Sequence, residues 1–393
     1  MSDVNVANSS STGYGGFAFL ESEARLILNE SSVTSYSIGD GGGIFLSGRS
    51  YFSASNGSFV AAGGTLGGLL YISDDALVFM DNMSLRRNIV AHAADDPFGN
   101  YTDYYEYYEV SDEAGGDGML LPLDGGAVYA TVFSQLQLTD VILQDFASQH
   151  KGGAIYLNQN AIATLANVSV LGSRGENGGA LYISDYAQVT LKELFISDCR
   201  ATKGGGGLYF HGQSYTALQD ITISECSAEQ GGAVFVDNDA RVRLRGGLSL
   251  QLNAASYGGA IYVDSHARLL SCVGCHISNN SAEISGGAVY VDFGGSAALG
   301  GAWIEANVAG GDGGAVFAQQ AHLSTSGSVF RHNIATDGGG IFVQGPAPPQ
   351  DAMKIELVNT TLDSNAAACG GAAVTIKARA ELAMVDCTVN GDN

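Results

Sequence analysis

The composition of this 393-residue chain excludes several classes of protein. Charged residues make up only 15% of it and apolar residues 46%, which is too apolar for an intrinsically disordered chain. The 40 acidic and 17 basic residues give a net charge of −23, and this charge disfavours nucleic acids as partners. The apolar runs are too short for a transmembrane helix, and the first residues lack the basic and apolar regions of a secretory signal.

A five-residue block that begins with Gly-Gly recurs along the whole chain. A small or apolar residue, an aliphatic residue and usually an aromatic residue follow the two glycines, as in residues 15–19. The block occurs 13 times, mostly at spacings of 25 to 28 residues. Such a period is the signature of a protein whose repeats stack on one another. We therefore expect residues 1–393 to form one domain, with repeats over 15–393.

The repeat at 178–203 illustrates the local structure that we expect. It contains three short runs with alternating apolar residues, near 180–183, 187–191 and 194–196, and glycines or polar residues separate them. Alternation of this kind predicts strands, and the separators predict turns. Three strands in one repeat make one coil of a solenoid. The predicted fold is an all-β parallel β-helix with three sheets and about 13 coils.

Two insertions interrupt the period, and both are expected to project from turns. The longer, at about 91–123, contains eight acidic residues and five tyrosines but no Lys or Arg. It is interpreted either as a partner-binding loop or as a mobile solvated loop. The shorter, at about 345–352, contains three prolines, which cannot donate to a strand ladder.

The first strand of each coil has two distinct faces. When each coil is numbered from its first glycine, positions 4 and 6 are mostly aliphatic, position 5 is aromatic in twelve coils, and position 7 is mostly polar. Side chains alternate across a strand, so we place positions 4 and 6 inside and position 5 outside. Stacked rings on the outer face would attract partners that lie flat on them; alternatively, the rings shield the sheet or face inward. The candidate ligand-binding residues are Tyr129, Tyr156, Tyr182, Tyr209, Tyr262 and Tyr290.

Three aspartates form the best candidate for chemistry. Asp237, Asp264 and Asp292 occupy position 7 of consecutive coils, so their side chains should stack about 5 Å apart. Their mutual repulsion should raise one pKa, or a Ca²⁺ ion could bind among them. Known parallel β-helix enzymes cleave polysaccharides on this same sheet, but that analogy is one of fold only. The alternative is a row of solvated turn residues.

The cysteines and the glycosylation sequons give further candidates. Cys199 and Cys226 share one coil position, so they should be neighbours on adjacent coils. Disulfides are expected if the protein is exported, and buried free thiols are the alternative. The disulfide candidates are Cys199, Cys226, Cys272, Cys275, Cys369 and Cys387. Asn-x-Ser/Thr sequons, which mark glycosylation candidates in an exported eukaryotic protein, include Asn29, Asn56, Asn82, Asn100, Asn167, Asn279 and Asn359.

A second motif recurs in phase with Gly-Gly-Ala-Ile/Val. It is an apolar residue, two variable residues and Asn, as in 277–280, 304–307, 330–333 and 362–365. Together the two motifs resemble the repeats of the polymorphic outer membrane proteins of chlamydiae. The resemblance implies a right-handed parallel β-helix that is exposed at a cell surface and acts in adhesion. In several coils another residue stands in place of the motif's Asn, for instance Cys199. The resemblance does not extend to the outer-membrane anchoring of the bacterial family.

The sequence thus favours a non-enzymatic cell-surface or extracellular protein whose partners are surface proteins or polysaccharides. The alternatives are a carbohydrate-binding or polysaccharide-cleaving enzyme that uses the first strand's sheet, and a purely architectural rod. No cofactor is expected apart from the calcium alternative. Neither end of the chain resembles a solenoid cap, so we also expect end-to-end self-association.

Overall fold

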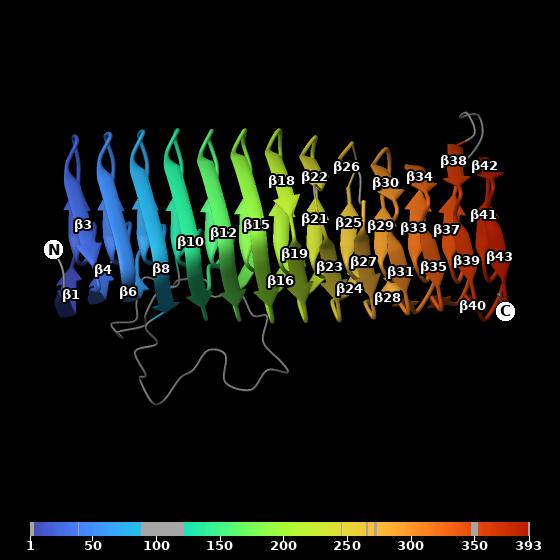
Figure 1. Ribbon diagram of the computed structural model, residues 1–393, viewed down its shortest axis with the longest axis horizontal. Coiled ribbons are helices and arrows are strands. Elements are labelled where there is room, and N and C mark those ends of the chain that lie inside the picture. The colour runs from blue at the N-terminus through green and yellow to red at the C-terminus, as the bar shows by residue number, and fades with distance from the viewer. Residues whose placement is uncertain are drawn as a thin grey trace, which may run out of the picture.

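The computed structural model describes residues 4–37, 39–87, 122–244, 246–264, 266–270, 273–346 and 353–391. They form a rod of stacked coils, with the N-terminus near one end and the C-terminus near the other (Figure 1). Every pair of neighbouring strands in the described residues is parallel, and the strands form three sheets. The predicted all-β solenoid with three sheets is confirmed. Among the described segments, none forms a helix of the length and apolar character that a membrane crossing requires.

Sheet B contains the strands that follow each Gly-Gly pair, and it has 13 of them. They are β2 (Ala18–Leu20), β5 (Ile44–Leu46), β7 (Leu70–Ile72), β9 (Val128–Ala130), β11 (Ile155–Leu157), β14 (Leu181–Ile183), β17 (Leu208–Phe210), β21 (Val234–Val236), β25 (Ile261–Val263), β29 (Val289–Val291), β33 (Val316–Gln319), β37 (Ile341–Gln344) and β41 (Val374–Lys377).

Sheet A contains the next segment of every coil. Its strands are β1 (Asn5–Ser11), β3 (Arg25–Asn29), β4 (Ser32–Ser37), β6 (Tyr51–Gly63), β8 (Leu77–Arg87), β10 (Gln135–Gln144), β12 (Ile162–Leu171), β15 (Gln188–Ser197), β18 (Tyr215–Gln219), β19 (Ile221–Ser224), β22 (Arg241–Leu244), β23 (Leu248–Gln251), β26 (Arg268–Leu270), β27 (Cys275–Ser278), β30 (Ser296–Gly300), β31 (Trp303–Glu305), β34 (His322–Ser326), β35 (Val329–Arg331), β38 (Met353–Val358), β39 (Thr361–Asp363), β42 (Ala380–Val385) and β43 (Thr388–Asn390).

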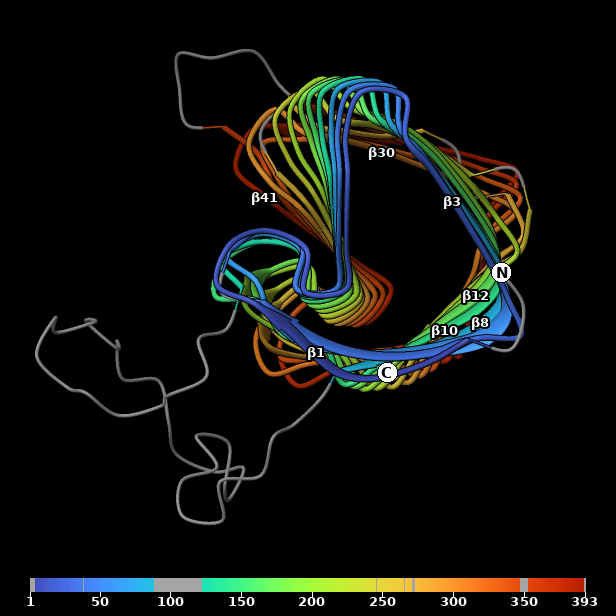
Figure 2. The ribbon, with the colours of Figure 1, turned by 90° about the vertical axis from the view of Figure 1, so that its left-hand side faces the viewer.

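Sheet C is formed by short strands that precede the Gly-Gly pairs. They are β13 (Arg174–Asn177), β16 (Arg200–Gly204), β20 (Ser227–Gln230), β24 (Ala254–Tyr257), β28 (Ser281–Ser285), β32 (Val308–Ala309), β36 (Ile334–Ala335) and β40 (Ala366–Ala367). Seen along the rod, equivalent strands of successive coils lie over one another (Figure 2).

The division of a coil into sheets differs from the prediction in one respect. The second and third predicted runs of the repeat at 178–203 lie in one strand, β15, and not in two sheets. Glu193 between them has a positive φ of 51°, yet the ladder with β12 continues on both sides of this residue. The local irregularity therefore does not turn a corner, and the third sheet is the short sheet C.

The main core lies between the sheets and is apolar. Positions 4 and 6 of the sheet B strands, such as Ile155 and Leu157, are fully buried in it. The predicted inward placement of these positions is thus confirmed. The aromatic residues of position 5 do not belong to this core, and five of them form a separate buried cluster: Phe235, Tyr262, Tyr290, Phe317 and Phe342.

The two glycines of each pair are required for different reasons, as the coil at Gly152 shows. Gly152 has a φ of +64°, and a Cβ on it would lie 2.3 Å from the carbonyl oxygen of Ile155. A Cβ on Gly153 would lie 2.0 Å from the carbonyl oxygen of Gly179 in the next coil. The first glycine therefore permits the corner, and the second permits the close approach of neighbouring coils.

A ladder of buried asparagines runs along the C-terminal half of the rod, at the Asn position of the second motif. From Asn280 onward, each side-chain oxygen accepts two bonds from the preceding ladder residue: Asn280 Oδ1 lies 3.0 Å from both the backbone nitrogen and Nδ2 of Asn253. Asn280 Nδ2 donates to the carbonyl oxygen of Leu250 at 3.0 Å. The ladder satisfies polar groups that would otherwise be buried without partners; its members are Asn253, Asn280, Asn307, Asn333 and Asn365.

Candidate functional site

The aromatic residues of position 5 form one continuous row along sheet B, from Phe19 to Phe342. Neighbouring ring centroids lie 4.6 to 5.4 Å apart. Most neighbours stack face to face, but Tyr156 is turned edge-on to both Tyr129 and Tyr182, at 75° and 72°. The sheet's register sets this spacing, because the position 5 residues of successive coils pair directly.

The segment that precedes each Gly-Gly pair covers much of this row. A Cβ on Gly204 would lie 2.8 Å from Cε2 of Tyr209 and 2.9 Å from Cδ2 of Phe235. Tyr257, in the equivalent position of a later coil, packs edge-on against Tyr290 with centroids 5.5 Å apart. The rings are therefore outside the main core and yet mostly buried.

This packing bears on the six candidate tyrosines. Tyr156 and Tyr182 are each 4% exposed, whereas Phe19 at the start of the row is 50% exposed. The faces of most rings are occupied by the neighbouring rings, so a partner would meet ring edges. The alternative in which the rings shield the sheet describes this geometry, and ligand binding by Tyr129, Tyr156, Tyr182, Tyr209, Tyr262 and Tyr290 stays a prediction.

The tyrosine hydroxyls connect this row to position 7. Tyr209 donates to Oδ2 of Asp237 at 3.1 Å, and Tyr262 donates to Oδ2 of Asp292 at 2.6 Å. Burial raises the pKa of both tyrosines far above its ordinary value, and the neighbouring carboxylates raise it further. These phenols are thus hydrogen-bond donors at any physiological pH.

The three aspartates lie where the sequence predicts, in the position 7 row, and His211 precedes them. His211 Nδ1 lies 2.7 Å from Oδ2 of Asp237, and Asp264 shares a side-chain hydrogen bond with Asp237. Burial raises the pKa of Asp237, but the bonds from His211, Asp264 and Tyr209 together outweigh it, and the net pKa is lowered.

This row could in principle move a proton. It combines an imidazole, a carboxylate of lowered pKa and a second carboxyl group in direct contact, which are the groups used in general acid–base catalysis. The Asp237 side chain is 11% exposed and that of His211 is 33% exposed. The row is therefore accessible mainly from the His211 side. His211 was missed as a candidate, although counting seven residues from Gly205 places it in the same row as the aspartates.

The geometry gives the calcium alternative no support. Asp237 is engaged with His211, and Asp292 with Tyr262 and the backbone nitrogen of Phe293. Within the described ranges, no three His, Cys, Asp or Glu side chains converge so that they could hold a metal ion.

A comparison with protein families identifies the fold type. The family model described as "Right handed beta helix region" matches residues 127–393. The chain belongs to this family. The family match thereby confirms the right-handed coil that the repeat resemblance implies. No curated protein matches the sequence.

Two solved structures show a distant similarity to this chain. One is the periplasmic alginate epimerase AlgG, with 10% identity over 94% of this chain and 77% of that chain and a TM-score of 0.48. The other is the cryo-EM structure of the Vag8–C1 inhibitor complex, with 13% identity over 98% of this chain and 100% of that chain and a TM-score of 0.48.

The cysteines of the β-helix are mostly free thiols. Cys199 and Cys226 are buried and free, and Cys369 and Cys387 are also free. In this structure the four cysteines thus follow the alternative of free thiols, and disulfide pairing among them stays a prediction. Each buried thiol instead points to a carbonyl oxygen two residues earlier, at 3.4 Å from Ser197 for Cys199. Cys275 is disulfide-bonded, whereas Cys272 lies outside the described residues.

Several sequon asparagines form a ladder on the surface of the β-helix. Asn56 Nδ2 donates to Oδ1 of Asn29 at 3.3 Å, and Asn82 Nδ2 donates to Oδ1 of Asn56 at 2.8 Å. Asn56 and Asn82, with Asn167, Asn279 and Asn359, have positive φ values, which Asn tolerates better than most residues. Their recurrence thus has a structural cause, and glycosylation stays a prediction. Asn100 lies outside the described residues, as do 88–121 and 347–352 of the two insertions.

Proposed function

We propose that this β-helix is a cell-surface or extracellular rod that binds a protein or polysaccharide partner in adhesion or matrix interaction, without catalysing a reaction. The observation that carries the proposal is the unbroken register of sheet B. It arranges equivalent side chains of successive coils into straight rows along the rod. Stacked repeats of this kind provide the extended surfaces on which repeat proteins bind their partners.

Two sequence features support the same function. The net charge of −23 favours basic partners, because a surface of one sign attracts the opposite sign and repels its own. The repeats also resemble those of the polymorphic outer membrane proteins, which are surface adhesins. We also propose that the protein is located outside the cell or in the cell envelope.

The test is a binding screen with the full chain immobilised. Purified matrix proteins and neutral, acidic and basic polysaccharides would be passed over it while surface plasmon resonance is recorded. We expect basic partners to bind and the binding to weaken as salt is raised, because exposed charges are screened. If no member of such a panel binds at low salt, or if binding is insensitive to salt and to heat-unfolding of the chain, the proposal is wrong.

A second candidate function rests on the contact between His211, Asp237 and Asp264. These groups could provide an acid and a base for polysaccharide cleavage on sheet B. We expect any cleavage activity to be abolished by Asp264→Ala and by His211→Gln, with Ser47→Ala, at the same position of an earlier coil, as the matched control. Absence of turnover by the unaltered chain over a broad panel of polysaccharides would remove this candidate.

A further inference from the structure

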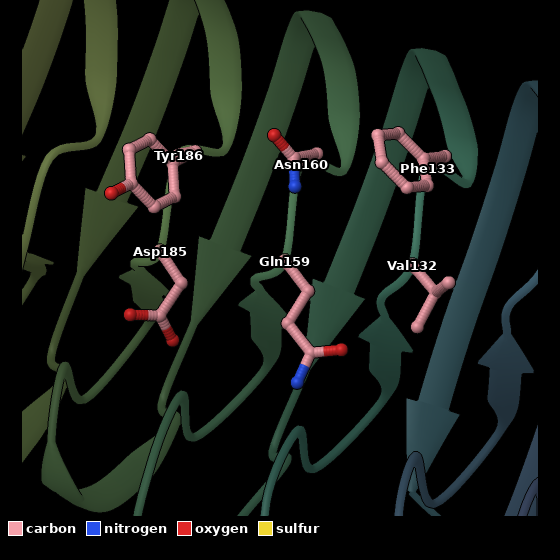
Figure 3. Close-up of a pocket in the computed structure, with 6 residues that line it drawn as sticks. All are labelled: Val132, Phe133, Gln159, Asn160, Asp185 and Tyr186. Carbon is pink, nitrogen blue, oxygen red and sulfur yellow. The ribbon is translucent and has the colours of Figure 1, made fainter.

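Two exposed aromatic rings flank a shallow depression on the turns that lead from sheet B to sheet A. The rings belong to Phe133 and Tyr186, which are 56% and 55% exposed. The depression has a volume of about 460 Å³ and is lined by Val132, Phe133, Gln159, Asn160, Asp185 and Tyr186. Figure 3 shows Asn160 between the two rings, both of which are seen broadside in the same view.

The backbone at these turns is unfavourable for large side chains. Val132, Phe133 and Tyr186 have φ values of 46°, 57° and 66°, in the left-handed region that Gly, Asn and Asp tolerate best. Equivalent turns of other coils carry Asn or Asp in this conformation, as at Asp74, Asp75, Asn160, Asn238 and Asp239. Bulky residues in this conformation cost backbone energy, and strain of this kind concentrates at functional sites.

Two polar residues of the depression are held in place by hydroxyl groups at position 7 of sheet B. The Oγ1 hydroxyl of Thr131 donates to Oε1 of Gln159 at 3.3 Å, and Oγ of Ser184 donates to Oδ2 of Asp185 at 3.1 Å. The site therefore presents amide and carboxylate groups at fixed positions beside two apolar faces. A few oriented polar groups among aromatic surfaces are typical of small-ligand sites.

The spacing and the charge indicate the class of ligand. Phe133 and Tyr186 lie on turns separated by one intervening coil, so two strand spacings, about 10 Å, divide them. The six lining residues include Asp185 but no Lys or Arg, which disfavours acidic sugars. We propose that the depression binds an uncharged, extended β-linked polysaccharide, with one sugar ring on Phe133, the next but one on Tyr186, and the sugar between them hydrogen-bonded by Asn160. The site lies on the turns rather than on the rows of sheet B, so this inference goes beyond the proposed function and does not depend on it.

The experiment uses two substitutions that remove the rings and relieve the backbone. Phe133→Asn and Tyr186→Asn place a residue that favours positive φ, so each variant should melt at the same temperature as the unaltered chain or higher. Each should bind a soluble neutral β-1,4-linked hexasaccharide about tenfold more weakly or worse, because burial of one aromatic side chain has an effect of that order. Titration calorimetry with cellohexaose, and electrophoresis through gels that contain xylan or polygalacturonate, would measure binding.

Two controls separate this site from general surface effects. Phe293 is 51% exposed at the equivalent turn of a later coil, so Phe293→Ala should leave binding unchanged. Phe133→Tyr keeps a ring and should also retain binding. The proposal is overturned if the unaltered chain binds no neutral glycan, if it binds polygalacturonate as tightly, or if both Asn variants bind as well as it does. Failure to bind neutral glycans would overturn this inference without changing the result of the binding screen with basic partners. The failure of this inference can therefore be distinguished from the failure of the proposed function.

Discussion

The N-terminal and C-terminal parts of the rod share one backbone and differ in two rows of side chains. In the five coils from Gly41 to the one that begins at Gly178, position 7 of sheet B carries uncharged residues such as Thr131 and Ser184, whereas the next four coils carry His211, Asp237, Asp264 and Asp292. The sheet B register is the same in both parts. The fold therefore does not depend on which polar residue stands at position 7, and the row is free to carry chemistry.

The Asn position of the second motif shows the opposite behaviour. In the C-terminal coils it carries the hydrogen-bonded ladder that begins at Asn253. In earlier coils it carries Ser173, Cys199 and Cys226, which are buried as well. Cys226 forms the junction, because its backbone nitrogen donates to Oδ1 of Asn253 at 3.0 Å. Here the residue type determines how well buried backbone groups are satisfied, so the two parts should differ in stability.

The largest expected effect concerns the middle of the ladder. Asn280→Ala would remove the acceptor of the Asn253 backbone nitrogen and the donor to the Leu250 carbonyl. Because both groups would stay buried without partners, we expect a loss of about 3 kcal/mol or more in the free energy of unfolding. Urea denaturation followed by circular dichroism would measure it.

Cys226→Ala is the matched control for this prediction. Its thiol contacts the carbonyl of Ser224 only weakly, at 3.3 Å, so removing the sulfur should cost about 1 kcal/mol through lost packing. Equal losses for the two variants would mean that the ladder contributes no more than the cysteines do, and the distinction between the two parts would disappear.

A smaller effect is expected at Asp237 and should depend on pH. A carboxyl group whose folded pKa lies below its unfolded value stabilises the fold above the unfolded pKa, and this stabilisation is lost as pH falls through the folded pKa. Since the pKa of Asp237 is lowered from 3.8, Asp237→Asn should destabilise the chain by about 2 kcal/mol above pH ~4, the order of a charge-assisted hydrogen bond.

Thermal melts between about pH 2.5 and pH 6 would check this prediction. The difference from the unaltered chain should shrink toward the acid end of the range. Thr131→Val removes a hydroxyl from the same row in the other part of the rod, and because its partner, Oε1 of Gln159, is uncharged, its effect should not vary with pH. A constant effect of Asp237→Asn over the whole range would contradict the assigned interactions.

The smallest expected effect concerns Lys151, whose Nζ lies 5.6 Å from the ring centroid of Tyr156 and 5.4 Å from that of Tyr182. Lys151→Met keeps the apolar stem and removes the charge, so the expected loss is about 0.5 to 1 kcal/mol from the cation–π contacts. Lys192→Met is the control, since Lys192 pairs with the exposed Glu193. Urea titrations in which both variants lose the same amount would show that the rings contribute nothing to the effect.

Much of this architecture could be predicted because the repeat samples each position many times. Alternation in the first strand placed Ile155 and Leu157 inside and the rings outside, since one polar position 7 fixes both faces of a strand. The Asn motif marked a recurring position, and the structure shows that it is a buried ladder.

The remaining features depend on contacts between segments that the repeat does not encode. The cover over Tyr209 comes from the close approach of Gly204, which belongs to a short polar segment without a strand signal. The partners of Asp237 depend on side-chain orientation, so the repeat pattern predicted a row of carboxylates but not the contact with His211. The apolar pattern of the sequence does not single out Phe133 and Tyr186, and it is their positive φ in the structure that distinguishes them.

The register of sheet B also makes each coil a removable unit. Residues 231–257 run from one Gly-Gly pair to the residue before the next. Without them, Gln230 would join Gly258, the strand of Leu208 would pair with that of Ile261, and His211 would face Asp264 in place of Asp237. A chain shortened in this way should keep its strand-rich circular dichroism spectrum while the order of groups along the rod changes, so whole-coil deletion or duplication could rearrange its surface without a new fold.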